Sequence, residues 1–273
     1  MVAYRNKLKS SIYKAGLRYV AKDKPFFRVW KYHFRGILPV AVFFPNFAGM
    51  KINAIITGST GMVGEGVLHV CLQHPGVESV LVINRRPCQV QHPKLKEIIH
   101  DNFYDFSPIN NQLTGYNACF FCMGVSSVGM KEDKYRSLTY DVTMALARVL
   151  APLNPGMVFN YVSGASTDST EKGRQMWARV KGKTENDLLA LPFGRAYMFR
   201  PGFMQPIPGM THVYRKNKYR VFKILSPLYP VLRGLFPRFV CSLREVGLAM
   251  INSVIKGYPK QVLEVTDIVA LSK

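Results

Sequence analysis

Acidic side chains are scarce in this chain. It has 16 Asp and Glu against 37 Lys and Arg in 273 residues, which gives a formal net charge of +21. This imbalance favours anionic partners, such as phosphate-bearing ligands or the surface of an anionic membrane. A basic chain also raises the question of nucleic acid, but the sequence has no zinc finger, RNA-recognition signature or helix-turn-helix pattern. We therefore expect no nucleic-acid partner.

Cysteine is also rare, and the five cysteines have neither the number nor the spacing of a disulfide framework. Cys119 and Cys122 spell C-x-x-C inside the apolar run 118–123, where residues three apart point to opposite faces of a strand. We interpret them as core or pocket-lining thiols. Free thiols are typical of a reducing compartment, so we expect a cytoplasmic location, with membrane association left open. The six histidines do not cluster as metal ligands do, so no metal site is expected.

An apolar run long enough to cross a membrane is missing from the first part of the chain. Residues 1–49 are basic and aromatic, and their apolar stretch, 37–47, is too short for a bilayer, which takes ~20 residues. A signal peptide would have a shorter basic region before its apolar part. Three interpretations remain: a membrane-surface or targeting segment, a disordered tail, or the product of an upstream start codon. We favour the third, because Met50–Ile52 resembles a natural start just before the first predicted strand.

The most informative motif is the run Thr57–Gly64, whose spacing is T-G-x-x-G-x-x-G. An apolar stretch before it, 52–56, predicts a buried strand, and a helical pattern follows over 62–73. A strand, a glycine turn and a helix are the context that a dinucleotide-binding fingerprint requires. The sequence therefore predicts a nucleotide cofactor site at this turn.

Each glycine of the turn has a predicted physical role. Gly58 permits the tight turn, Gly61 lets the backbone approach a pyrophosphate, and Gly64 lets the helix pack closely on the strand. The N-terminus of the helix offers free N–H groups and a positive dipole end to the phosphates. We predict that the cofactor contacts are made by Gly58, Ser59, Thr60, Gly61, Met62, Val63 and Gly64.

Strand and helix patterns alternate beyond residue 51, which predicts an α/β fold, a doubly wound, mostly parallel Rossmann sheet with helices on both faces. The predicted strands are 52–56, 79–84, 97–100, 118–123, 157–162, 196–199 and 261–265, and the predicted helices are 62–73, 133–153, 174–189 and 243–255. This domain would span 50–273. Residues 203–240, rich in proline, apolar and basic side chains, would form a small C-terminal cap. The cap is either a set of packed short helices or a basic, apolar surface that contacts lipid headgroups or a long-chain substrate.

The end of the second predicted strand decides the choice of cofactor. Roughly 20 residues after the glycine turn, an acidic residue would bind the ribose hydroxyls of NAD, whereas an arginine accommodates a 2′-phosphate. The chain has Asn84, Arg85 and Arg86 there and no acid. Because a guanidinium pairs with phosphate through a fork of donors, we predict NADP rather than NAD.

Two further strand ends are expected to border the cofactor, because ligands of parallel sheets lie at the carboxyl ends of the strands. Asp101 follows the third predicted strand and is placed to accept from the adenine amino group. Cys122, Met123 and Gly124 end the fourth and are expected beside the ribose and the phosphates.

From residue 51 to about 205, and more loosely to 265, the chain resembles an atypical short-chain dehydrogenase/reductase of the NAD-dependent epimerase/dehydratase type. The most similar subgroup contains the Tat-interacting oxidoreductase and its bacterial relatives. The matching stretches are 57–64, 84–86, 121–124, 161–163, 180–185 and 199–202, with 242–250 resembling the late helix of the family. The resemblance implies a nicotinamide-dependent oxidoreductase and does not identify its substrate. Together with the two arginines after Asn84 and the apolar cap, it leads us to expect an NADP-dependent oxidoreductase that acts on an unknown, hydrophobic small molecule.

The family uses a serine, a tyrosine and a lysine for catalysis, in which the tyrosine is the general acid and base. By resemblance, Ser163 and Lys181 match the serine and the lysine, and Lys181 also holds the nicotinamide ribose. Trp177 stands four residues before Lys181, where the tyrosine is expected, and an indole cannot relay a proton. Another tyrosine could take over the proton transfer, but we do not expect it. The candidates are Tyr140, Tyr161 and Tyr197.

Two functions of different classes follow from this pattern. The first is an oxidoreductase with an altered acid and base, and the second is a catalytically impaired NADP(H)-binding sensor or regulatory protein. A third, weaker hypothesis is peripheral contact with anionic lipid through the basic, apolar segments 26–47 and 219–240. The sequence predicts neither the substrate nor the oligomeric state.

Overall fold

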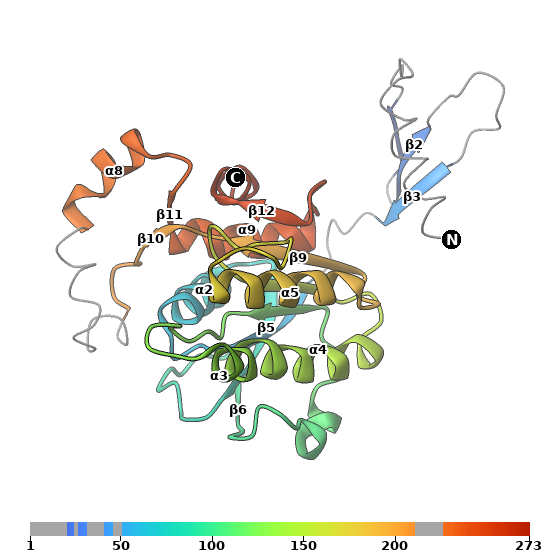
Figure 1. The fold of residues 1–273 in the computed structure, drawn as a ribbon. Coiled ribbons are helices and arrows are strands. Elements are labelled where there is room, and N and C mark those ends of the chain that lie inside the picture. Colours follow the sequence, from blue (N-terminus) through green and yellow to red (C-terminus); the bar gives the residue numbers. More distant parts are fainter. Residues whose placement is uncertain (1–20, 25–26, 32–40, 46–50, 211–225) are drawn as a thin grey trace. The chain divides into compact units, whose positions relative to one another are not determined.

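The computed structural model describes residues 21–24, 27–31, 41–45, 51–210 and 226–273 (Figure 1). The chain divides into two compact units, Met1–Ala48 and Gly49–Lys273. The described residues of the first unit form an antiparallel sheet in the order β1-β2-β3, with β1 at Ala21–Lys24, β2 at Phe27–Lys31 and β3 at Ala41–Pro45. Most of the basic extension lies outside the described residues, and its three interpretations stay predictions.

The second unit is built on a seven-stranded parallel sheet in the order β12-β9-β8-β7-β4-β5-β6. Its strands are β4 (Ile52–Thr57), β5 (Val77–Asn84), β6 (Leu95–Ile99), β7 (Ala118–Phe121), β8 (Val158–Val162), β9 (Arg195–Arg200) and β12 (Val262–Glu264). The chain runs from β4 outward in one direction and from β7 outward in the other. This reversal confirms the predicted doubly wound sheet and creates a crevice at the carboxyl ends of β4 and β7.

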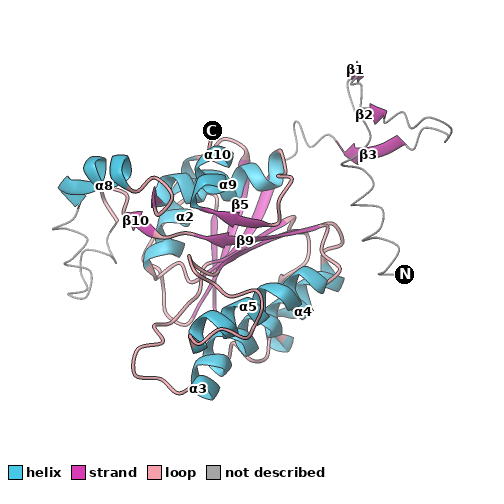
Figure 2. Cartoon of the chain, turned by 45° about the horizontal axis from the view of Figure 1, so that its top comes forward, coloured by secondary structure: helices cyan, strands magenta, loops and turns pink. Residues whose placement is uncertain are grey.

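Helices cover both faces of this sheet (Figure 2). One layer holds α2 (Met62–Gln73), α9 (Leu243–Ile255) and α10 (Val265–Leu271). The other holds α3 (Glu132–Arg136), the π-helical turn η2 (Ser137–Asp141), α4 (Val142–Leu153) and α5 (Met176–Ala190). The central strands carry nearly continuous apolar runs, as in β4, because both of their faces are covered. None of the helices in the described part of the chain has the length and apolar character needed to cross a bilayer.

Two parts of the predicted C-terminal region differ in the structure. The last predicted strand, 261–265, is shorter and is followed by α10, because Glu264 and Asp267 form a reciprocal capping box that starts a helix at Val265. In the predicted cap, β10 (Phe203–Gln205) pairs in parallel with β11 (Val240–Ser242), and η4 (Ser226–Leu228) leads into α8 (Tyr229–Leu235). Residues 211–225 of the predicted cap lie outside the described residues.

Candidate functional site

The glycine turn between β4 and α2 is defined by close backbone approaches. Gly58 has a φ of +72°, and Gly61 donates its N–H to the carbonyl of Gly58 at 2.9 Å. A Cβ on Gly58 would lie 2.8 Å from the Met123 backbone, and one on Gly64 would lie 2.1 Å from the Gly58 carbonyl oxygen. Gly61 is the N-cap residue just before α2, so the free N–H groups of the first turn lie at this loop.

A pocket of about 530 Å³ opens at this turn. It lies at the carboxyl ends of β4, β5 and β7, beside the reversal of the strand order. Its walls are Gly58, Thr60, Gly61, Ile83, Asn84, Arg85, Arg86, Phe103, Cys122, Met123 and Gly124. Four segments far apart in the sequence therefore meet here, which is the arrangement expected for a nucleotide crevice.

Most of the predicted cofactor residues line this pocket, but not all. Ser59, Met62, Val63 and Gly64 belong to the turn and the first turn of α2 without forming the pocket wall. Asp101 is exposed and does not line the pocket, whereas Phe103, two residues later, does. Ile83 and Phe103 had no sequence signal beyond being apolar, and only the fold brings them to the pocket.

Asn84 holds the turn in place. Ser59 donates its hydroxyl to Asn84 Oδ1 at 2.9 Å, and Asn84 Nδ2 donates to Glu97 Oε1 at 2.7 Å. The same Glu97 oxygen accepts the Cys88 N–H at 2.9 Å. Through these hydrogen bonds, Asn84 and Glu97 link the glycine turn to β5 and β6. Glu97 was not predicted, since its partners lie at least nine residues away in the sequence.

Arg85 and Arg86 follow Asn84 at the end of β5 and line the same pocket. Both are exposed, and neither pairs with an acidic side chain among the described residues. Their guanidinium groups are thus available to an anion at the rim of the pocket.

The two predicted catalytic residues, Ser163 just after β8 and Lys181 on α5, do not form the pocket wall. The Ser163 hydroxyl is buried and lies 2.5 Å from Glu185 Oε1 and 3.1 Å from the carbonyl of Phe199. Lys181 donates from Nζ to the carbonyl of Ser163. Burial lowers the pKa of Lys181 from 10.5 to about 8, and the negative charge of Glu185 opposes this shift.

A buried ion pair between Arg200 and Glu185 lies next to Ser163 and Lys181. Arg200 donates from Nε to Glu185 Oε1 at 3.0 Å and from Nη2 to Oε2 of the same carboxylate. Arg200 also contacts Ser169 at 2.5 Å and Glu264 at 3.3 Å. The Glu185 side chain is 1% exposed, so the pair joins α5 to β9 inside the protein. The sequence showed Glu185 inside a matching stretch but indicated no role for it.

Trp177 and the tyrosines considered as its substitutes do not line the pocket at the strand ends. Trp177 is half-buried and packs on the apolar layer under α5. Tyr161 is buried, which raises its pKa. Tyr197 donates to the carbonyl of Tyr258 at 3.3 Å and accepts its N–H at 2.9 Å. Neither of these tyrosines lines the pocket at the strand ends.

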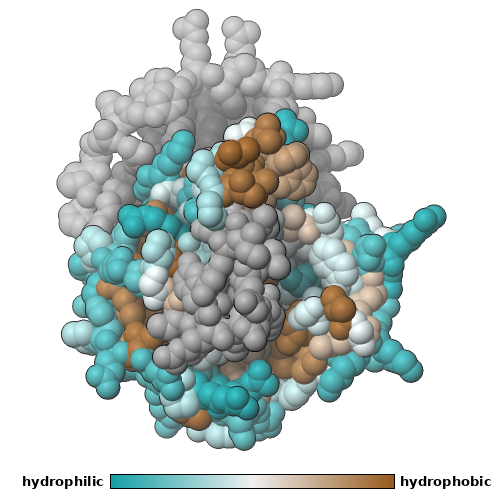
Figure 3. Space-filling view, turned by 90° about the vertical axis from the view of Figure 1, so that its left-hand side faces the viewer, coloured by the Kyte–Doolittle hydropathy of each residue, from teal (hydrophilic) through white to brown (hydrophobic). Residues whose placement is uncertain are grey.

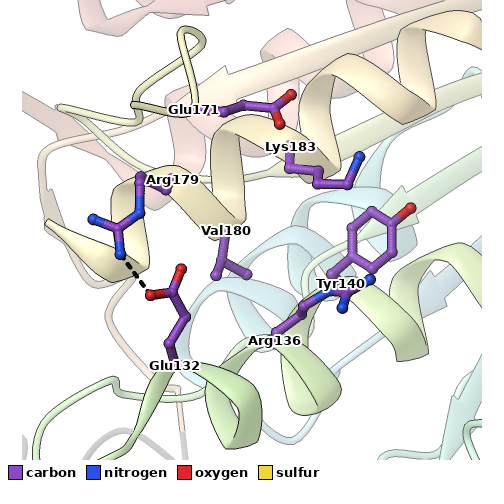
Figure 4. Close-up of a pocket in the computed structure, with 7 residues that line it drawn as sticks. All are labelled: Glu132, Arg136, Tyr140, Glu171, Arg179, Val180 and Lys183. Atoms are coloured by element: carbon purple, nitrogen blue, oxygen red, sulfur yellow. Dashed lines mark hydrogen bonds and ion pairs between the residues drawn. The ribbon is translucent and has the colours of Figure 1, made fainter. Parts of the chain in front are cut away.

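Tyr140 belongs to a second, smaller pocket of about 130 Å³ between η2 and α5 (Figure 4). Its hydroxyl donates to Asp187 at 2.5 Å, and Lys183 binds the same carboxylate at 3.0 Å. The pocket is lined by Glu132, Arg136, Tyr140, Glu171, Arg179, Val180 and Lys183. It shares no residue with the pocket at the strand ends, so Tyr140 lines a separate pocket.

The five thiols and the candidate metal ligands are the other groups of the described residues that could form a site. All five cysteines are free and buried, and burial raises the pKa of each. Cys119 and Cys122 lie in opposite layers of the core, as residues three apart on a strand should. Within the described ranges, no group of His, Cys, Asp or Glu could hold a metal ion.

Comparison with curated proteins finds fungal relatives. "Protein fmp52-1, mitochondrial" of Aspergillus oryzae is 29% identical over 158 residues, which cover 56% of this chain and 66% of the relative. "Protein FMP52, mitochondrial" of Meyerozyma guilliermondii is 23% identical over 187 residues, or 66% of this chain and 79% of the relative. The match thus spans slightly less than two thirds of the first relative. No family model matches the chain.

The names of these relatives contradict the expected cytoplasmic location, because they are called mitochondrial. The expectation rested on cysteine usage. Free, buried thiols do not distinguish one reducing compartment from another.

Solved structures with the same fold include a short chain dehydrogenase family protein from Francisella tularensis (15% identity, TM-score 0.55, covering 76% of this chain and 92% of the other). The Bordetella bronchiseptica enzyme WbmF in complex with NAD+ is 14% identical, with a TM-score of 0.56 and coverage of 82% and 77%. The ADP-L-glycero-D-manno-heptose-6-epimerase of Helicobacter pylori has the same identity and TM-score, with coverage of 82% of each chain. These similarities do not test the predicted subgroup of the Tat-interacting oxidoreductase, which stays a prediction. The second unit therefore has the Rossmann-like fold of short-chain dehydrogenases and NAD-dependent epimerases.

Proposed function

We propose that this chain binds NADP(H) in the pocket at the strand ends and uses it as an oxidoreductase on a hydrophobic carbonyl compound or alcohol. The pocket wall carries this proposal. It combines a glycine turn at a helix N-terminus, which suits a pyrophosphate, with two guanidinium groups that pair with no acidic side chain of the described residues and suit a 2′-phosphate. In line with the names of the fungal relatives, we place the protein in mitochondria.

Arg85→Ala and Arg86→Ala should each weaken NADPH binding about tenfold or more and leave NADH binding nearly unchanged. A charge-assisted hydrogen bond contributes about 1.5–3 kcal/mol, and only NADPH carries the 2′-phosphate that would use it. The measurement is a fluorescence titration of the full chain with each nucleotide.

Arg148→Ala is the matched control, since Arg148 is an exposed arginine on α4 that does not line the pocket. Unchanged NADPH affinity in both pocket variants, or an equal loss in the control, would contradict the assignment of the 2′-phosphate site.

The chemistry would depend on Lys181. Bound NADPH would supply a hydride to the carbonyl carbon of the substrate. The carbonyl oxygen would then carry the negative charge and need a proton. Trp177 cannot supply it, and the Ser163 hydroxyl is directed to Glu185. The Lys181 ammonium uses one N–H on the carbonyl of Ser163 and has two others left. Its pKa of about 8 lies near working pH, which suits a general acid.

The rate of carbonyl reduction should therefore fall as the pH rises through about 8. Burial lowers the pKa of Lys181, so the amine is protonated and able to donate below this value and is neutral above it. The measurement is NADPH oxidation with a panel of apolar aldehydes and ketones between about pH 6 and about pH 10. Lys181→Arg should abolish the inflection near pH 8, because arginine stays charged throughout this range. An inflection that persists in this variant would exclude Lys181 as the acid.

The alternative function is an NADP(H)-binding sensor without turnover. The observation that favours it is the pairing of the Ser163 hydroxyl with Glu185 together with Trp177 in place of a tyrosine. Tight NADPH binding without any oxidation over the carbonyl panel would support the sensor. Turnover that appears only in Trp177→Tyr would support it as well, since the original chain would then lack only the proton donor of the reaction.

A further inference from the structure

Apolar side chains gather on the outside of the segment around α8. Nine large hydrophobic residues are exposed in the described part of the chain, and five of them fall between positions 228 and 239. These five define the α8 patch: Leu228, Val231, Leu235, Phe236 and Phe239. Each is between 49% and 67% exposed. Brown, hydrophobic atoms are visible on this side of the molecule in Figure 3.

The patch faces outward because the opposite side of α8 is bound to the rest of the domain through Arg233. Arg233 binds Glu245 with Nη2 at 2.8 Å and the carbonyl of Val240 with Nη1 at 2.5 Å. Glu245 also forms a capping box with Ser242, the N-cap residue just before α9. Since Leu228, Val231 and Leu235 are three and four residues apart, they share the opposite face of the helical turn. The contacts of Arg233 thus orient α8 so that the apolar side chains of the patch are exposed.

The segment that carries the patch is strongly basic. Between Phe203 and Arg244 the sequence has no Asp or Glu, and its cations are Arg215, Lys216, Lys218, Arg220, Lys223, Arg233, Arg238 and Arg244. Arg238 and Arg244 are exposed, and no acidic side chain of the described residues pairs with either. An apolar face bordered by cations matches the interface of an anionic bilayer, where side chains enter the boundary of the headgroups and bases contact phosphate.

A second copy of the chain fits this surface poorly. A two-fold interface brings the same patch of both copies together, so Arg238 and Arg244 of each would meet like charges. An anionic lipid surface instead offers the opposite charge and an apolar interior at the same place.

We propose that the α8 patch docks this protein on an anionic lipid bilayer. The five apolar side chains enter the membrane interface, and Arg238 and Arg244 contact the lipid phosphates. This inference does not depend on the proposed function, because none of these residues lines the pocket at the strand ends.

The test is sedimentation of the full chain with vesicles of phosphatidylcholine alone and of an equal mixture of phosphatidylcholine and phosphatidylglycerol. Binding should require the anionic lipid and weaken as salt is raised. The double variant Leu235→Ser with Phe236→Ser should lower the partition coefficient about tenfold or more, because two apolar side chains no longer enter the interface. Val128→Ser is the matched control, since Val128 is 87% exposed outside the patch.

Vesicle binding that is unchanged in the double variant would overturn the proposal, because another part of the chain would then hold the membrane. Absence of binding by the unsubstituted chain would overturn it as well. A change of oligomeric state in the double variant, measured by light scattering, with lipid binding unaltered would assign the patch to a second copy instead. Both variants should keep the NADPH affinity and the melting temperature of the original chain, since all the substituted side chains are exposed.

Discussion

Gly64→Ala should destabilise the protein by about 3 kcal/mol or more and weaken NADPH binding at least tenfold. The added Cβ would lie 2.1 Å from the carbonyl oxygen of Gly58, 2.5 Å from its carbon and 2.8 Å from the Ser59 nitrogen. All three atoms belong to the backbone, so no side chain can move away to relieve the contact. The first turn of α2 would have to shift from the loop whose N–H groups are proposed to bind the phosphates.

The measurements are urea denaturation and NADPH titration of the full chain. Gly124→Ala is the control for stability, because Gly124 belongs to the same pocket wall and its Cβ would meet no atom within 4 Å. If Gly64→Ala unfolds at the same urea concentration as Gly124→Ala, the close approach of helix and loop is not a requirement of this fold. A loss of stability without a loss of affinity would show that the turn does not bind the nucleotide.

The glycine turn could be predicted because its signal is local. The run Thr57–Gly64, the apolar strand before it and the helix after it lie within about two dozen residues, and the structure has α2 at the predicted Met62–Gln73. The same holds for α9, whose start at Leu243 follows the capping Ser242. Elements with strong periodicity and nearby start signals were thus identified with correct type and nearly correct ends.

The interactions that complete the site could not be predicted, because they join residues from separate elements. The link from Ser59 through Asn84 to Glu97 depends on the alignment of β4, β5 and β6. Phe103 reaches the pocket and Asp101 does not, although both follow β6 within four residues. Periodicity shows which side of a strand is apolar, but the path of a loop beyond the strand end depends on tertiary packing.

The predicted serine illustrates the same limit. Its position at the end of β8 could be inferred from the sequence, but the partner of its hydroxyl could not. That partner, Glu185, lies on α5 and is itself held by Arg200 from β9. A pattern that names Ser163 as catalytic therefore does not show whether its hydroxyl is free to bind a substrate.

Glu185→Ala should cost about 3–5 kcal/mol of stability, because the largely buried guanidinium of Arg200 loses its buried counter-charge and keeps only the exposed carboxylate of Glu264. The loss would be measured by urea denaturation of the full chain. Glu132→Ala is the matched control, since it breaks the partly exposed pair with Arg179 at 2.5 Å and should cost less than about 1 kcal/mol.

The double variant Glu185→Leu with Arg200→Met distinguishes a buried charge from a general loss of packing. Replacing both partners by apolar side chains removes the unpaired charge, so much of the lost stability should return. If the double variant is as unstable as Glu185→Ala, the polar contacts of Arg200 with Ser169 and Glu264 matter more than the ion pair.

The same substitution has an effect on the proposed chemistry that packing alone would not produce. Glu185 raises the pKa of Lys181 against the larger, opposite effect of burial. Without this carboxylate, the ammonium form of Lys181 loses its stabilising negative charge, and its pKa should fall below about 8. The inflection in the rate of carbonyl reduction should then move to lower pH in Glu185→Ala and stay in place in Glu132→Ala. An inflection that does not move would mean that the proton comes from a group other than Lys181.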